Sequence, residues 1–220
     1  MADELRSEED QVDAIKRWWK SSGSSILVGA VLAGIAVFGW KYWQDHQERQ
    51  AAEASSRYQQ LIQLVSQNQT IDGQTRTQVN ELIDTIEQKD GDTLYANLAT
   101  LIQARLAVQD GSMDSARNIL SGLIERNQDA YIERVARINL ARLQLGEGAP
   151  KDALSTLSSL SDGPLSGYAE AVRGDAHQAL GQDQQALKAY KAAQQHAQQS
   201  DLPIFGLQLK IDDLAPEETP

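Results

Sequence analysis

Small residues recur at fixed offsets from residue 104 to residue 186 of the chain. Three times a glycine stands five residues before an alanine, and another small residue stands twelve residues before each of these alanines. The glycines are Gly111, Gly148 and Gly181, the alanines are Ala116, Ala153 and Ala186, and the earlier small residues are Ala104, Ala141 and Gly174. The alanines are 37 and 33 residues apart, so the sequence predicts consecutive copies of one helical unit.

These small residues have a packing explanation. Two helices approach closely only where no bulky side chain lies between them, and glycine permits the tight turn that joins them. Spacings of about 34 residues are typical of tetratricopeptide repeats, in which each unit is a helical hairpin. A simple helical bundle also places alanines between its helices, but three offsets that hold in three units favour repeats. In the middle unit, Gly146 competes with Gly148 for the turn.

Apolar periodicity predicts further helices on both sides of the three units. Residues 44–66 and 79–86 carry apolar stripes at helical spacing, and the same spacing resumes at 204–214. The last of these helices would cover the open end of the stack, as terminal units of repeat proteins must. We predict an all-α fold with a tetratricopeptide-like domain over 44–214 and a disordered tail over 215–220.

An uncharged stretch precedes the repeat region. No charged residue lies between Lys20 and Lys41, and twenty residues of helix cover about 30 Å, the thickness of the hydrocarbon core of a bilayer. Tryptophans border the stretch at both ends, as is typical of the headgroup layer. A cleaved signal peptide is the alternative, but no small-residue cleavage site follows. The sequence therefore predicts a single N-terminal transmembrane helix over 21–43.

Basic residues indicate an orientation for that helix. Lys16, Arg17 and Lys20 lie close to its N-terminal end, whereas Lys41 alone lies close to the other end. This distribution favours a cytoplasmic segment over 1–20, with an amphipathic helix, and in a bacterium a periplasmic repeat domain. Small residues four apart would let another membrane helix approach closely, although small residues are common in membrane helices generally. These residues are Gly29, Ala30, Ala33 and Gly34.

The composition excludes several classes of function. A formal charge of −11, from 20 basic and 31 acidic residues, disfavours nucleic acid as a partner. The chain has no cysteine, and its three histidines lack the spacing of metal ligands. No phosphate-binding loop or nucleophile elbow occurs in the sequence. We therefore expect no catalysis, no metal and no cofactor, which leaves binding.

The repeat positions also predict where binding would occur, because the first helix of each tetratricopeptide hairpin lines the concave surface. Arg105 and Arg142 lie at equivalent positions one repeat apart on an otherwise apolar strip. Their guanidinium groups would bind a peptide carboxylate or backbone carbonyls. The alternative is that each arginine pairs with an acidic residue on a neighbouring helix. The predicted groove consists of Leu98, Leu101, Arg105, Val108, Val135, Ile138, Arg142, Leu145, Tyr168, Asp175 and Gln178.

Three segments of the chain resemble one known family. They are residues 10–19 (DQVDAIKRWW), 39–43 (GWKYW) and 209–214 (LKIDDL), and the likeness extends through Val172–Ala176 in the same order. These segments are similar to those of the YfgM-like ancillary subunits of the bacterial Sec translocon. The resemblance implies a single-span inner-membrane protein with a periplasmic tetratricopeptide-like domain that assists proteins emerging into the periplasm. As partners it implies the Sec translocon subunits, a membrane-anchored periplasmic chaperone of the prolyl-isomerase type, and nascent or unfolded periplasmic proteins; the predicted span adds the lipid bilayer.

Three functions remain open at this point. The first is a non-enzymatic, chaperone-like interaction module beside the translocon. The second is a structural scaffold or adaptor for another cell-envelope assembly, in which the repeats bind one dedicated protein. The third is a transmembrane sensor that signals through residues 1–20.

Overall fold

The chain is all-helical in the part that its computed structural model describes, which comprises residues 2–67, 72–91, 93–126 and 129–215. The side chains of residues 2–31 and of Gln67 lie outside this description. The chain divides into two units between Glu53 and Ala54. Helix α1 (Ala2–Gln67) begins in the first unit, and its last residues belong to the second.

The transmembrane part of the predicted architecture has to be corrected. Where side chains are described, no helix combines the length and the apolar character that a membrane crossing needs. Residues 21–31 of the predicted span have no described side chains, and from residue 32 the uncharged run lasts only to Trp40, because Lys41 follows it and Asp45 comes one turn later. A span needs about 20 apolar residues, which this described run does not supply.

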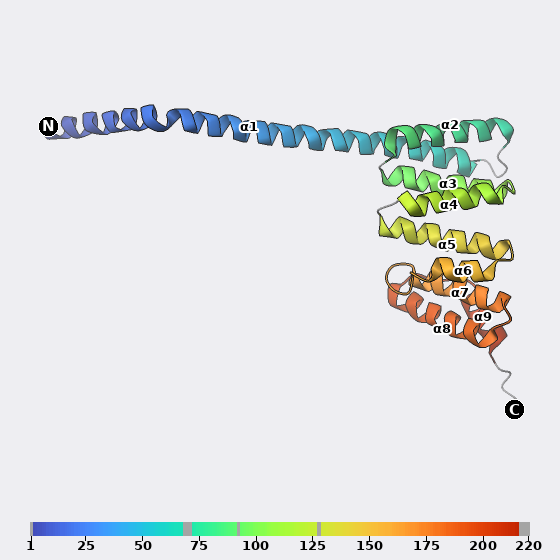
Figure 1. Ribbon diagram of the computed structural model, residues 1–220. Helices are drawn as coiled ribbons and strands as arrows, with labels where there is room; N and C mark the ends of the chain where they lie inside the picture. Colours follow the sequence, from blue (N-terminus) through green and yellow to red (C-terminus); the bar gives the residue numbers. More distant parts are fainter. Residues whose placement is uncertain (1, 68–71, 92, 127–128, 216–220) are drawn as a thin grey trace. The chain divides into compact units, whose positions relative to one another are not determined.

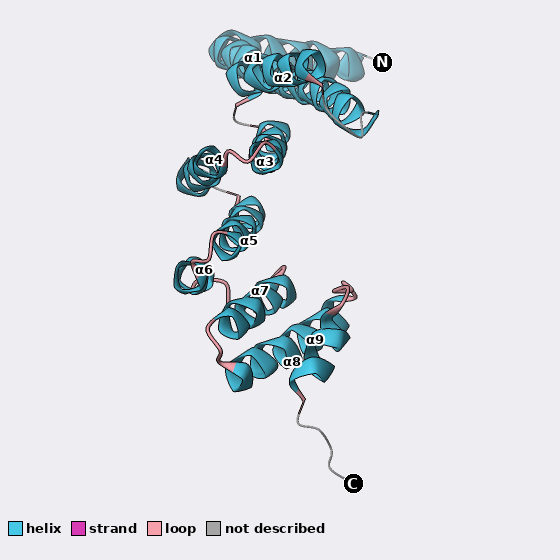
Figure 2. Cartoon of the chain, turned by 90° about the vertical axis from the view of Figure 1, so that its right-hand side faces the viewer, coloured by secondary structure: helices cyan, strands magenta, loops and turns pink. Residues whose placement is uncertain are grey.

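The second unit is a stack of helical hairpins. Its helices are α2 (Gly73–Asp90), α3 (Leu94–Gln109), α4 (Met113–Arg126), α5 (Ala130–Gly146), α6 (Pro150–Leu157), α7 (Ser166–Ala179), α8 (Asp183–Ser200) and α9 (Leu207–Leu214). Figure 1 shows α2 to α8 stacked in chain order, and Figure 2 shows α3 and α5 along one side with α4 and α6 along the other. The predicted tetratricopeptide-like hairpins are therefore present as α3 with α4, α5 with α6, and α7 with α8.

The three hairpin turns share one backbone conformation. Gly111, Gly148 and Gly181 have φ values of 73°, 76° and 70°, in the left-handed region that glycine adopts without steric cost. In each turn the N–H of the next residue donates a hydrogen bond of 2.8–2.9 Å to a carbonyl five residues earlier in the first helix. This arrangement is a common way to end a helix. Gly146 is the last residue of α5, so Gly148 makes the middle turn.

The other six small residues of the repeat pattern lie where the helices of each hairpin meet, and all six are buried. Ala104 shares a core cluster with Leu120, and Ala141 shares the next cluster with Leu157. In the third hairpin the equivalent pair is Gly174 and Tyr190, and a Cβ atom added at Gly174 would come within 2.2 Å of the tyrosine ring. A smaller residue on one helix thus accommodates a larger one on the other.

Both ends of the stack are covered by helices outside the three hairpins. The end of α1 packs on α2 and α3, since Ala54 and Leu61 are fully buried and Leu61 lies in a core with Val79, Ile83 and Ile86. At the other end, α9 buries Leu207 and Ile211 against α8, as its apolar spacing predicted. Residues 216–220 of the predicted tail lie outside the described residues.

Candidate functional site

A groove of about 590 Å³ opens between the first two hairpins of the stack. It is built mainly by α3 and α5, with contributions from the end of α1, from the start and middle of α4, and from the turn after α5. Most of the side chains are apolar. The lining residues are Tyr58, Leu98, Leu101, Ile102, Ala104, Arg105, Val108, Met113, Leu120, Val135, Asn139, Arg142, Leu143, Gly146 and Glu147.

Six of the eleven residues that the sequence places in a groove line this one. They come from the first helices of two consecutive hairpins and are Leu98, Leu101, Arg105, Val108, Val135 and Arg142. Two other predicted residues, Ile138 and Leu145, pack instead in the core cluster between α5, α6 and α7. The groove is therefore confined to two repeats.

The three predicted groove residues of the last hairpin have other partners. The hydroxyl of Tyr168 donates a hydrogen bond to the carbonyl of Pro203 at 3.2 Å. Asp175 and Gln178 both accept from the hydroxyl of Tyr190, at 2.7 and 3.0 Å, and Asp175 also pairs with Lys210 of α9. The terminal helix and the loop before it thus occupy the positions that a ligand would need.

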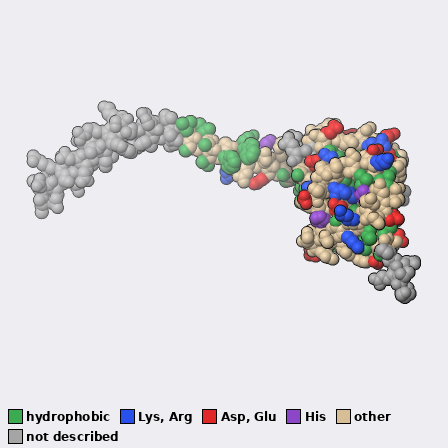
Figure 3. All heavy atoms as spheres, turned by 60° about the horizontal axis from the view of Figure 1, so that its bottom comes forward, with side chains coloured by type: hydrophobic (Ala, Val, Ile, Leu, Met, Phe, Trp, Pro, Cys, Tyr) green, Lys and Arg blue, Asp and Glu red, His purple; other side chains and the backbone are tan. Residues whose placement is uncertain are grey.

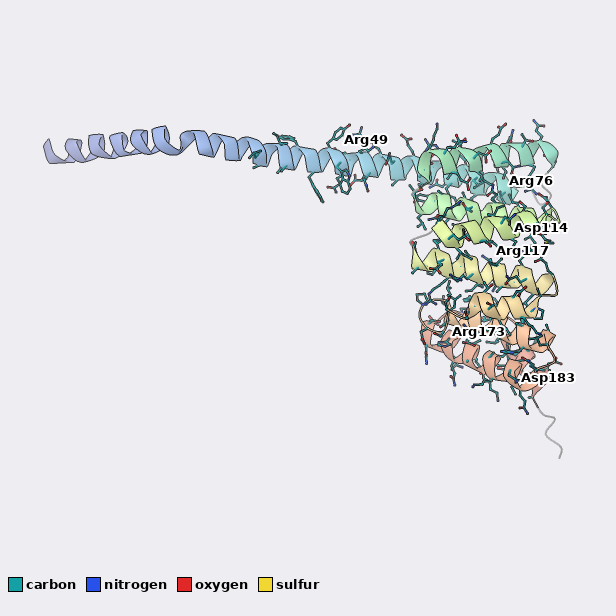
Figure 4. All side chains as sticks on the ribbon, in the orientation of Figure 1. Arg49, Arg76, Asp114, Arg117, Arg173 and Asp183 are labelled. Carbon is teal, nitrogen blue, oxygen red and sulfur yellow. The ribbon has the colours of Figure 1, made fainter. Side chains whose placement is uncertain are left out.

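Arg105 and Arg142 are exposed in the groove without a partner. Neither guanidinium forms a hydrogen bond or an ion pair with any other residue that the structure describes, although eight other described arginines each contact a carboxylate or a backbone carbonyl. Figure 4 labels Arg76, Arg117 and Arg173 among these paired residues. The ion pair with a neighbouring helix that was the alternative for Arg105 and Arg142 is therefore not formed within the described part of the chain.

Acidic residues near the groove are already engaged. Arg117 of α4 binds Glu147, which lines the groove, at 2.5 Å, and Arg76 of α2 pairs with Asp110 in the first hairpin turn. The Arg117–Glu147 pair connects the first hairpin to the second, and the Arg76–Asp110 pair connects α2 to the first hairpin. Figure 3 shows acidic and basic side chains interspersed over one face of the repeat unit. Two unpaired guanidinium groups on an apolar wall therefore make this groove a local cationic site in an acidic protein.

Tyr58 adds an uncharged hydroxyl to the edge of the groove. Its ring lies 5.7 Å from that of Tyr95, measured between centroids. Burial raises the pKa of Tyr58, and the nearby charge of Arg105 offsets part of this effect. The phenol is thus neutral at neutral pH and can donate or accept a hydrogen bond beside Arg105.

The repeat geometry agrees with a comparison to known families. The sequence pattern of a family described as "Tetratricopeptide repeat-like domain" matches residues 16–216. The chain belongs to this family. This tetratricopeptide repeat-like domain is also similar to curated proteins that share one name.

Three curated relatives are each named "Ancillary SecYEG translocon subunit". One from Haemophilus influenzae is 33% identical over 109 residues, and one from Aggregatibacter actinomycetemcomitans is 36% identical over 103 residues. These matches cover 50% and 47% of both the chain and the relative. One from Escherichia coli is 41% identical over 61 residues, which is 28% of the chain and 30% of the relative.

The chain thus spans about half the length of the curated relatives it matches first. The resemblance to ancillary subunits of the Sec translocon, drawn above from short segments of the sequence, is confirmed by these names. No solved structure matches the tetratricopeptide repeat-like domain significantly.

Several groove residues of the tetratricopeptide repeat-like domain were not predicted from the sequence. Tyr58, Met113 and Glu147 lie on the end of α1, at the start of α4 and in the turn after α5, whereas the prediction used first helices only. A sequence signal existed for Tyr58, which lies on the apolar stripe of 44–66. No such signal marks Met113 or Glu147, because their place in the groove depends on how consecutive hairpins stack.

The remaining predicted residues lie elsewhere. Ala33 is exposed and a Cβ atom at Gly34 would meet nothing within 4 Å, while Gly29 and Ala30 lie outside the residues whose side chains are described. Among described side chains, no group of three or more histidine and acidic residues is placed to hold a metal ion. His177 contacts Gln182 at 2.7 Å near the third hairpin turn.

Proposed function

We propose that this tetratricopeptide repeat-like domain is a non-enzymatic, ancillary component of the bacterial Sec translocon that holds segments of emerging polypeptides in its groove. The observation that carries the proposal is the groove itself, in which apolar side chains surround two unpaired arginines at equivalent repeat positions. The shared name of the three curated relatives supports the translocon as the place of action.

The chemistry of the groove suits an unfolded chain. An emerging polypeptide exposes apolar side chains that a folded protein would bury, together with backbone carbonyls that have no partner. Leu98, Leu101 and Val135 offer apolar surface, and each guanidinium offers five N–H donors in a fixed planar arrangement. Binding of this kind depends on no particular sequence, which a component that meets many proteins requires.

Proximity to the exit site makes weak binding sufficient. A groove held within a few nanometres of an emerging chain meets it at an effective concentration of roughly millimolar. Modest affinity then gives high occupancy, and the segment can leave quickly when folding begins. We place the domain on the periplasmic face, where a membrane-anchored chaperone of the prolyl-isomerase type would act on the same emerging proteins.

Site-specific photocrosslinking in living bacteria tests the proposal. A photoreactive residue replaces Val108, which lines the groove and is 38% exposed. The matched control replaces Asn118, which is exposed on α4 and does not line the groove. We expect Val108 to crosslink to translocon subunits and to secreted proteins in transit, and Asn118 to give neither product. Equal products from both positions, or none from Val108 while secretion proceeds, would refute the assignment.

A further inference from the structure

We propose that the groove selects segments in which acidic side chains are separated by apolar residues, with their carboxylates bound by Arg105 and Arg142. This inference rests on the proposed function and narrows its ligand from any extended segment to an acidic one. It names a chemical preference that apolar burial alone would not produce.

The first reason for this preference is that Arg105 and Arg142 have no hydrogen-bond or ion-pair partner among the described residues. A guanidinium left without a partner in a folded protein gives up charge-assisted hydrogen bonds that acidic neighbours would otherwise provide. This chain has acidic residues in excess, and eight other described arginines contact a carboxylate or a carbonyl. Arg105 and Arg142 form no such contact within the described residues, and both line one groove. Their donors are available to an anion that comes from outside.

The surroundings of the arginines are the second reason. Glu147, an acidic residue in the groove lining, is bound by Arg117 and so does not neutralise the two free guanidinium groups. Apolar walls lower the dielectric constant beside the guanidinium groups, which strengthens the attraction between opposite charges relative to open solvent. Arginine also binds a carboxylate through two parallel N–H donors, which gives it a geometric preference for this group over a single carbonyl.

The contact between the helices that carry the arginines indicates the spacing of the ligand's acidic residues. Helices α3 and α5 contact each other directly, and packed helices lie about 8–10 Å apart. An extended segment in the polyproline II conformation advances about 3.1 Å per residue with three residues per turn. Side chains three residues apart then lie on one face, at about 9 Å from each other. Acidic residues at every third position therefore suit two arginines carried by neighbouring helices.

Peptide binding to the whole 220-residue chain tests this preference. The probe is a fluorescein-labelled peptide of repeated Leu-Ala-Glu units, compared by fluorescence anisotropy with analogues that carry Gln or Lys in place of Glu. We expect the Glu peptide to bind about tenfold more tightly than the Gln peptide, and this advantage to shrink as salt is added. The Lys peptide should bind most weakly, because like charges repel.

Variants of the chain test whether Arg105 and Arg142 cause the preference for the Glu peptide. The double variant Arg105→Gln, Arg142→Gln should bind the Glu and Gln peptides equally, and neither more tightly than the parent binds the Gln peptide. Arg137→Gln is the matched control, since Arg137 lies on the same helix as Arg142, pairs with Glu133 and does not line the groove. It should keep the full preference for the Glu peptide.

The outcomes separate this inference from the proposed function. If the Gln peptide binds in the groove and the Glu peptide binds no better, the inference is wrong and the proposed function stands. The inference is also wrong if the double variant keeps the preference, or if Arg137→Gln removes it as completely. If none of the three peptides binds, both the inference and the groove's proposed role are refuted.

Discussion

Gly174 and Tyr190 show how a single residue sets the distance between two helices. The tyrosine is fully buried, and its ring occupies the space that a side chain at position 174 would need. The first two hairpins have alanine at this position and leucine opposite. In the third hairpin the alanine is replaced by the smaller glycine and the leucine by the larger tyrosine. The small residues of the repeat pattern could be predicted from their offsets, because close helix packing requires them. The pairing of the smaller glycine with the larger tyrosine could not be predicted in this way, since it depends on which side chain lies opposite.

Gly174→Ala should therefore destabilise the repeat domain. The added Cβ atom would lie 2.2 Å from the Tyr190 ring, and overpacking of this kind costs about 1–3 kcal/mol of unfolding free energy. The control is Gly122→Ala in α4, where a Cβ atom meets nothing within 4 Å and alanine is the better helix former. Urea unfolding followed by circular dichroism measures both variants. If the two substitutions change the midpoint alike, the close contact between α7 and α8 is wrong.

At the scale of elements, the turns and the terminal helix were more predictable than the groove. A glycine that ends a helix is a local feature, so Gly111 and Gly181 could be assigned from spacing alone, whereas the structure was needed to choose Gly148 over Gly146. Whether a concave position is open to a ligand depends on the next element in space. Asp175 and Gln178 fit the predicted groove, yet the structure commits them to Tyr190 and to the docking of α9.

The burial of Tyr190 against α7 predicts that the stability of the fold depends on alkaline pH. Lys210 of α9 pairs with Asp175 and lies 5.5 Å from the centre of the Tyr190 ring. Burial raises the pKa of Tyr190 above its ordinary value of 10.0, and the hydrogen bond to Asp175 raises it further. The pKa of Tyr190 is therefore higher in the folded state than in the unfolded state. The contribution of the neutral phenol to stability is fully present below pH 10 and is lost as the pH rises through the folded-state pKa.

We therefore expect the unfolding free energy to fall as the pH is raised above about 10. Tyr190→Phe removes the ionisable group, so the variant should be less stable at neutral pH but should lose less stability between neutral and alkaline pH. Urea unfolding at a series of pH values gives both quantities. A variant whose stability declines with pH as steeply as that of the parent would show that Tyr190 does not cause the dependence.

The chain combines a formal charge of −11 with a groove that carries two unpaired arginines. The net charge and the absence of cysteine excluded other classes of function and left binding as the expected activity. The tetratricopeptide-like character of the repeat domain was predicted from the spacing of its small residues. The expected membrane span was the part of the architecture that had to be corrected. That expectation counted uncharged residues across 21–40, whereas the apolar run with described side chains begins at residue 32 and ends at Trp40. A predicted membrane span depends on the apolar character of every residue in a long stretch. A predicted repeat depends only on the spacing of a few small residues.

The most direct test of the account is the recovery of bound proteins with a tagged form of the whole chain from bacterial membranes. The variant Arg105→Glu, Arg142→Glu reverses the charge of these two groove positions and breaks no hydrogen bond or ion pair that the structure describes. We expect its helicity and unfolding midpoint to match those of the parent, while the amount of emerging secreted protein recovered with it falls severalfold, in line with about 1 kcal/mol or more of lost binding. Equal recovery of these proteins by the folded variant and the parent would contradict the central claim that the groove is the binding surface.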